Sequence, residues 1–170
     1  FALIGSHRSC DIQVGGSSSI PPVAYFVACL EQCIEVWPTS AIAFPRWGAI
    51  RPDIELLVGR SRITVHHPDV SVHDSSPLPY LSDCVIETSM TWPGKTIDKS
   101  FRRPVTVIGD THPSVLRLHG RGMRRCHHAA VVAQDGLWIV NVSPTDLTPD
   151  QRVQKLQQPD DTAQIGDVTV

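Results

Sequence analysis

Short apolar segments, interrupted at close intervals by proline, glycine and serine, are the feature that most limits the folds open to this chain. Each segment is rich in Val, Ile, Thr or aromatic residues and ends at a Gly, Pro, Asp or Ser. No stretch of about a dozen residues places apolar side chains at the spacing of an amphipathic helix. Closely spaced strands separated by turn residues are typical of antiparallel β-sandwiches. The pattern therefore predicts an all-β chain.

The length and composition are compatible with one domain or with two small ones. The chain has 170 residues, of which 41% are hydrophobic and 19% charged, a balance that supports a packed core and argues against disorder. No apolar run approaches the ~20 residues that cross a bilayer, so no membrane partner is expected. The chain opens at Phe1 inside an apolar segment, and we expect it to be a fragment or a processed piece.

An internal repeat divides the chain into two similar halves. Residues 1–5 match 105–109, residues 12–14 match 116–118, and residues 24–28 match 129–133. Both halves also close on an apolar residue followed by glycine, Val58-Gly59 and Ile165-Gly166. Two tandem copies of one β domain explain these matches better than chance. We expect a first domain, clipped at its N-terminus, in residues 1–66, a linker in 67–83 and a second domain in 84–170.

The second copy resembles the forkhead-associated (FHA) family, β-sandwiches that typically bind phosphothreonine peptides. The resemblance rests on Val107-Ile108-Gly109, on His127-His128-Ala129-Ala130 entering a strand, and on segments 135–140 and 161–166. A hairpin over 84–101, turning at Trp92-Pro93-Gly94, would complete that domain. The resemblance implies two degenerate FHA-like antiparallel β-sandwiches in tandem. The second core is expected to include Ile108, Leu118, Val131, Ile139 and Trp138, with the inward member of the last two left open.

The resemblance also implies a degenerate phosphate pocket. FHA domains that bind phosphopeptides have an Arg after an early Gly, a Ser three residues before a His, and an Asn in a later loop. In the second copy, Asp110 follows the Gly, Arg125 takes the Ser position before His128, and Asp146 stands near the Asn position. A carboxylate beside a phosphate opposes binding through like charge. The corresponding residues of the first copy are Ser6, Ile20 and Val23, so its site is expected to be lost.

A glycine-rich basic segment, His119-Gly120-Arg121-Gly122-Met123-Arg124-Arg125, falls where the family holds phosphate. Glycines allow tight turns with exposed backbone N–H groups, and the guanidinium fork binds phosphate or carboxylate. The ordinary alternative is a solvated, charged loop without a ligand. His128 itself is expected to be a structural histidine. If the second copy has kept phosphopeptide binding, the candidate residues are Arg121, Arg124, Arg125, His128 and Asp146.

The residue patterns disfavour catalysis, metal binding and nucleic-acid binding. No Gly-x-Ser-x-Gly segment marks a hydrolase nucleophile, and Gly120-Arg121-Gly122 lacks the Lys-Ser/Thr of a phosphate loop. Adjacent His127 and His128 on one strand should point to opposite faces, and the Cys and His spacings show no repeated zinc pair. Interleaved aromatic residues that stack on bases are missing near the arginines. We expect no enzyme, metal, cofactor or nucleic-acid partner.

The cysteines indicate the cellular compartment. The five cysteines are odd in number and follow no disulfide framework, so we expect reduced thiols and a cytoplasmic location.

The predicted function is a non-catalytic protein-interaction module of a signalling or regulatory protein, with a protein or phosphoprotein as partner. Two alternatives remain open, a phosphothreonine-peptide receptor in the second copy and a structural segment of a larger signalling protein such as a kinase or cyclase.

Overall fold

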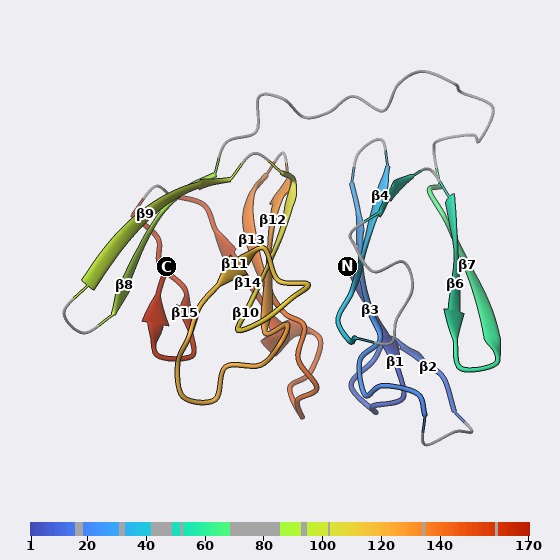
Figure 1. Ribbon diagram of the computed structural model, residues 1–170. Helices are drawn as coiled ribbons and strands as arrows, with labels where there is room; N and C mark the ends of the chain where they lie inside the picture. Colours follow the sequence, from blue (N-terminus) through green and yellow to red (C-terminus); the bar gives the residue numbers. More distant parts are fainter. Residues whose placement is uncertain are drawn as a thin grey trace. The chain divides into compact units, whose positions relative to one another are not determined.

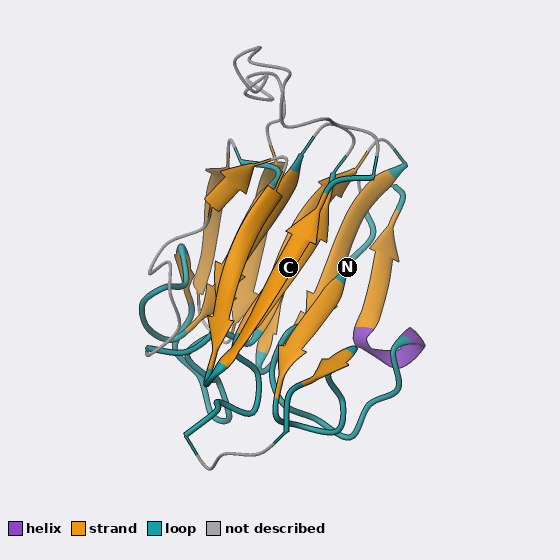
Figure 2. Ribbon diagram, turned by 90° about the vertical axis from the view of Figure 1, so that its right-hand side faces the viewer, coloured by secondary structure: helices purple, strands orange, loops and turns teal. Residues whose placement is uncertain are grey.

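The computed structural model describes residues 1–15, 19–30, 33–41, 49–51, 53–68, 86–92, 95–101, 103–133, 135–158 and 160–170. The chain forms two compact units, unit 1 with Phe1–Pro79 and Pro144–Thr148, and unit 2 with Tyr80–Ser143 and Pro149–Val170. Strands dominate both units (Figure 1), and the only helix in the described part is one 3-10 turn, η1 (Asp150–Arg152), purple in Figure 2. The all-β prediction is confirmed. No described helix has the length and hydropathy needed to cross a membrane.

Unit 1 contains a five-stranded sheet and a separate hairpin. The sheet has the order β2-β1-β3-β4-β5, and the hairpin consists of β6 (Asp53–Val58) and β7 (Ser61–His66). The sheet strands are β1 (Ala2–Gly5), β2 (Ile12–Gln13), β3 (Tyr25–Cys29), β4 (Ile34–Pro38) and β5 (Ala49–Arg51). β1 is parallel to β2 and antiparallel to β3. β1 and β2 therefore both end, and β3 begins, at the same end of the sheet.

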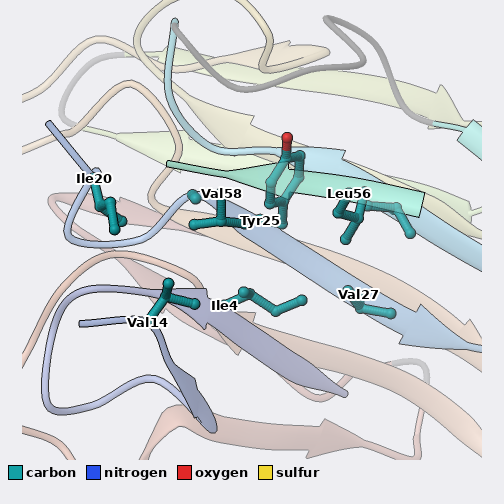
Figure 3. Close-up of a cluster of buried hydrophobic side chains, with 9 residues drawn as sticks. Ile4, Val14, Ile20, Tyr25, Val27, Leu56 and Val58 are labelled. Atoms are coloured by element: carbon teal, nitrogen blue, oxygen red, sulfur yellow. The ribbon is translucent and has the colours of Figure 1, made fainter. Parts of the chain in front are cut away.

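The core of unit 1 lies between this sheet and the hairpin (Figure 3). Ile4 from β1 and Tyr25 from β3 pack in one buried cluster with Leu56 and Val58 from β6. Leu57, between the two core residues of β6, is 58% exposed because alternate side chains of a strand point to opposite faces. The alternating pattern of β6 thus directs one face of the hairpin onto the sheet.

Unit 2 is a β-sandwich made of two sheets. One sheet has the order β11-β10-β12-β13-β14 and the other β15-β16-β8-β9. The first is built from β10 (Val105–Gly109), β11 (Leu116–Arg117), β12 (His128–Ala133), β13 (Gly136–Asn141) and β14 (Val153–Leu156). The second is built from β8 (Ile86–Trp92), β9 (Lys95–Phe101), β15 (Gln164–Ile165) and β16 (Val168–Thr169). Residues of both sheets, among them Ile108, Ile165 and Val168, share one buried cluster. The predicted hairpin around Trp92-Pro93-Gly94 corresponds to β8 and β9, which pair along their whole length.

The two units repeat the same strand arrangement. Ile4 of β1 pairs in parallel with Ile12 of β2, and Ile108 of β10 pairs in the same way with Leu116 of β11. Both C-terminal hairpins turn at a glycine with positive φ, 64° at Gly59 and 60° at Gly166. The backbone geometry therefore supports the internal repeat that the sequence predicts.

One part of the sequence alignment between the copies was wrong by two residues. Ile4 pairs with Tyr25, and Ile108 pairs with His128, so Tyr25 and not Val23 is the counterpart of His128. The residue three positions earlier, at the Ser position, is accordingly Pro22 and not Ile20 in the first copy. A shift of two residues keeps every side chain on the same face of a strand, so the apolar pattern could not reveal the error.

Ile139, and not Trp138, faces the core of unit 2. Ile139 is 3% exposed and belongs to the cluster that holds Ile108 and Leu118. The Trp138 indole lies on the opposite face, where its Nε1–H donates to Asp135 Oδ1 at 2.9 Å and Lys155 Nζ lies 5.1 Å from the ring centroid. Val131 pairs with Trp138 in the sheet and is buried, but it is not a member of this core cluster.

The orientation of β13 predicts the effect of removing one methyl group. Ile139→Val is expected to lower the free energy of unfolding by about 1 kcal/mol, because the lost methyl leaves a small cavity in the core. Ile12→Val makes the same chemical change at a side chain that is 42% exposed, and we expect a change within about 0.5 kcal/mol. Urea denaturation followed by far-ultraviolet circular dichroism measures both. Equal losses for the two variants would contradict the assignment of Ile139 to the core.

Candidate functional site

Three connections of unit 2 meet at one end of its five-stranded sheet. In the antiparallel ladder, Ile108 near the end of β10 pairs with His128 at the start of β12, and His128 pairs with Asn141 at the end of β13. The segments that follow β10, precede β12 and follow β13 therefore emerge side by side. We call residues 110–115, 118–127 and 142–143 the loop end of unit 2.

Backbone hydrogen bonds hold the segments of the loop end together. Asp110 N–H donates to Arg124 O at 2.9 Å, His127 N–H donates to Ile108 O at 2.8 Å, and Val142 N–H donates to His127 O at 3.0 Å. The Ser114 hydroxyl adds a bond of 2.6 Å to Arg125 O. The loop end is thus fixed by the ladder of β10, β12 and β13 rather than by the side chains it exposes.

The three candidate arginines are all exposed at the loop end. Arg125 Nη1 donates to His112 O at 2.7 Å, which ties its guanidinium to the segment after β10. Arg124 lies next to it and contributes its carbonyl to the ladder described above. Arg121 lies in a turn closed by Met123 N–H donating to Gly120 O at 3.2 Å. The structure therefore presents three cationic side chains to solvent on one loop.

The two candidate acidic residues have different surroundings. Asp110 stays at the loop end, where its Oδ1 accepts a bond of 3.0 Å from Thr111 Oγ1. Asp146 belongs to Pro144–Thr148, which groups with unit 1, and its carboxylate accepts two bonds from Arg8, at 3.1 and 2.6 Å. The Arg8 guanidinium, by this hydrogen bond and its charge, holds the pKa of Asp146 below its usual value. Of the two, only Asp110 is grouped with the arginines.

His127 and His128 do not point to opposite faces, contrary to the sequence-based expectation. Their rings make an edge-to-face contact with centroids 4.7 Å apart and an interplanar angle of 89°. The reason is that β12 begins at His128, so His127 precedes the strand and escapes its alternation. The Nδ1 atoms of both rings are buried, with no hydrogen-bond partner among the described residues.

Burial keeps both imidazoles neutral near pH 7. Desolvation lowers the pKa of His128 to about 3, with a smaller contribution from the neighbouring His127. Burial also lowers the pKa of His127, and the positive charge of Arg124 adds to this effect. Neutral imidazoles contribute no positive charge to an anion site, so the charge of the loop end comes from the arginines.

Cys126 directly precedes these histidines in the sequence, and its side chain, which is of a type that can act as a nucleophile, is buried. Desolvation raises the pKa of its thiol to about 11, although the Ser114 hydroxyl and the Arg125 charge act in the opposite direction. A protonated, buried thiol is a poor nucleophile and a poor metal ligand. Within the described part of the chain, no three His, Cys, Asp or Glu side chains gather in a way that could hold a metal ion.

Ser114 is the main structural residue of the loop end that the sequence reasoning missed. It lies five residues after Gly109, and Cys10 lies five residues after Gly5 in the first copy. The two are equivalent, because Cys10 Sγ donates to Pro22 O at 3.3 Å as Ser114 donates to Arg125 O. The repeated spacing of a glycine and a small hydrogen-bond donor is the signal that could have identified Ser114.

Comparison of the chain with protein-family models, with curated proteins and with solved structures found no match. The FHA resemblance accordingly rests on the sequence motifs alone.

Proposed function

We propose that the chain is a non-catalytic, FHA-like protein-interaction module and that the loop end of unit 2 binds acidic peptide segments. The observation that carries this proposal is the cluster of exposed arginines, Arg121, Arg124 and Arg125, on loops that the backbone ladder fixes. A backbone that is already fixed lowers the conformational entropy that the loop loses on binding, and guanidinium groups bind carboxylate and phosphate through paired hydrogen bonds. The partner is a cytoplasmic protein or phosphoprotein in this proposal.

The charges at the loop end favour general acidic recognition over a phosphothreonine pocket. Asp110 occupies the position where phosphopeptide-binding FHA domains have arginine, and it places a negative charge on the same surface. One Arg125 donor is already used by His112 O, and neutral His128 adds no charge. The repulsion from one carboxylate is comparable to the gain from one charge-assisted bond, roughly 1–4 kcal/mol. Phosphate dependence is therefore expected to be weak.

The absence of enzymatic activity is part of the same proposal. The buried thiol of Cys126 stays protonated at neutral pH because its pKa is raised to about 11. Two neutral histidines in contact, with no described hydroxyl or thiol activated by them, do not form a nucleophile–base pair. These properties support a binding role for the loop end.

Phosphothreonine recognition in unit 2 is the second candidate, and Arg125 is the observation that favours it. Its guanidinium is held in place by His112 O at the position where the family has a phosphate-binding serine. A restrained guanidinium can still offer its remaining donors to phosphate oxygens. In this case phosphopeptides should bind far more tightly than their unphosphorylated forms.

Titration with matched peptides tests the proposal. We expect an Asp/Glu-rich peptide to bind the full chain, and the double variant Arg121→Ala, Arg124→Ala to weaken this binding about tenfold or more through the loss of two charge-assisted contacts. Arg103→Ala, which removes the same kind of charge from an exposed position just before β10, is the control and should have no effect. Phosphothreonine peptides are expected to bind with Kd above about 100 µM.

Two outcomes distinguish the candidate functions. Low-micromolar, phosphate-dependent binding that Arg125→Ala abolishes would establish the second candidate in place of the first. Failure of the acidic peptide to bind, or equal binding by the double variant, would show that the arginines serve only as a solvated surface. Asp110→Arg is expected to raise affinity for phosphopeptides, because it replaces a repulsive charge with an attractive one.

A further inference from the structure

We propose that the outer edge of β7 in unit 1 is a docking site for an extended peptide segment, which binds by adding a strand to the β6–β7 hairpin. Among the described residues, β6 is the only strand that pairs with β7. In unit 2 the matching hairpin, β15–β16, is joined on its β16 edge by β8, with Thr169 opposite Thr91. The site lies in unit 1 and does not depend on the loop end of unit 2.

The two hairpins correspond residue by residue, which defines the register of the site. Each turns through two residues, with Val58 opposite Ser61 in one and Ile165 opposite Val168 in the other. The first turn residue is a glycine with positive φ in both, as a type II′ turn requires. Counting from the turn, Arg62 takes the place of Thr169. Because Thr169 pairs with Thr91 of β8, we expect Arg62 to pair with the added strand in the same way.

The backbone of β7 directs unpaired groups away from β6 at alternate residues. In a hairpin with a two-residue turn, the closing pair, Val58 and Ser61, exchanges backbone hydrogen bonds, and every second pair after it does the same. The intervening residues Arg62, Thr64 and His66 therefore point their N–H and C=O groups outward. This is the arrangement that an added strand uses, with main-chain bonds supplying affinity.

The hydrophobic core of unit 1 continues to this edge. Ile63 and Val65 of β7, together with Ile54 of β6, are only partly buried where they pack against the core cluster. A neighbouring strand with apolar side chains at every second position would extend this cluster, because side chains of adjacent strands on one face lie in contact. Continuity with the existing core thus sets the pattern of the occupant on its inner face.

The charge of the edge sets the chemistry of the occupant on its outer face. The Arg62 side chain is 74% exposed and touches only Glu55 of β6, at 3.2 Å, among the ion pairs of the described residues. Arg60 in the turn adds a second exposed positive charge nearby. An acidic side chain opposite Arg62 forms a favourable cross-strand pair, and a basic one is repelled. The expected occupant is a partner's extended segment with alternate apolar residues and an acidic residue opposite Arg62.

Hydrogen exchange of the full chain with a synthetic strand tests the docking site. The probe is a peptide of residues 86–101, the sequence of β8 and β9, carrying Thr91→Glu so that an acid lies opposite Arg62. We expect the amides of Arg62, Thr64 and His66 to exchange about tenfold more slowly with the peptide bound, because they become hydrogen-bonded. The amides of Ile63 and Val65, already bonded to β6, should change little. A peptide with Thr91→Lys should bind several-fold more weakly, and Arg62→Glu should reverse that preference.

Thr64→Pro supplies the decisive variant. Proline removes the outward N–H of this residue and leaves the bonds between β6 and β7 in place, since proline is tolerated on the free side of an edge strand. Peptide protection at Arg62 and His66 should disappear in Thr64→Pro and persist in the control Thr64→Val. Circular dichroism of both variants should match that of the parent chain.

Three results would overturn the proposal. The first is no protection of the three outward amides at saturating peptide, or equal protection in Thr64→Pro. The second is a change confined to Thr169, which would mean that the peptide displaces β8 in unit 2. The third is protection that depends on protein concentration without peptide, which would make a second copy of the chain the occupant.

Discussion

Gly109→Ala is expected to destabilise unit 2 by about 3–5 kcal/mol, a loss as large as that from truncating a buried Leu or Ile side chain to Ala. A Cβ atom at Gly109 would lie 2.1 Å from the carbonyl oxygen of Arg125 and 2.6 Å from its carbonyl carbon. The added Cβ would also lie 2.6 Å from the Ser114 hydroxyl oxygen. Because two of the three obstacles are backbone atoms, only a separation of β10 from the segment before β12 relieves the clash. That separation breaks the hydrogen bonds that fix the loop end.

Gly120→Ala is the matched control for this variant. A Cβ at Gly120 meets nothing nearer than Asp167 Oδ2 at 3.8 Å, an ordinary contact, so the change in the free energy of unfolding should stay within about 0.5 kcal/mol. Gly5→Ala should repeat the large loss in unit 1, because its Cβ would lie 2.3 Å from Pro22 O. Urea denaturation compares the three variants with the parent chain. A Gly109→Ala variant as stable as Gly120→Ala would refute the close approach.

The strands could be predicted because their signals are local. Alternating or continuous apolar residues bounded by turn residues mark β10, β12 and β13. The predicted hairpin over 84–101 contains β8 and β9, and its Pro93 and Gly94 lie outside the described residues. The repeat could be found for the same reason, since two glycines recur at equivalent places, Gly5 with Gly109 and Gly59 with Gly166. The register of the third match, residues 24–28 with 129–133, could not be predicted, because runs of alanine and valine look alike when they are shifted by two residues.

The candidate site could be predicted only in its residue types. The arginines are exposed on one loop as expected, but the bond from Arg125 to His112 O joins residues that no local pattern connects. The sequence makes Asp146 a candidate by its place in a later loop, whereas its partner in the structure is Arg8, 138 residues away in the sequence. The alternation rule failed at His127 because the strand begins one residue later. Long-range contacts and the exact strand start are what a single sequence leaves undetermined.

Acidification is expected to destabilise unit 2 through His128, by about 2–3 kcal/mol between pH 7 and pH 4. Burial lowers the pKa of His128 to about 3, whereas an unfolded histidine titrates near 6.5. Below about pH 6.5 the unfolded chain therefore binds a proton at His128 that the folded chain does not bind. The free energy of unfolding falls as the pH decreases through this window, by up to ~1.4 kcal/mol for each pH unit, until the folded His128 also titrates near pH 3.

His128→Gln removes this titration and keeps a polar side chain, so its stability should change less between pH 7 and pH 4 than that of the parent chain. His119→Gln replaces an exposed histidine of the same loop end and should retain the parent's acid sensitivity. Urea denaturation at several pH values gives the slopes for the three proteins. Because Tyr25 replaces His128 in unit 1, this histidine-linked loss should be confined to unit 2, and hydrogen exchange can follow each unit separately. An unchanged slope in His128→Gln would mean that other groups, His127 among them, account for the acid sensitivity.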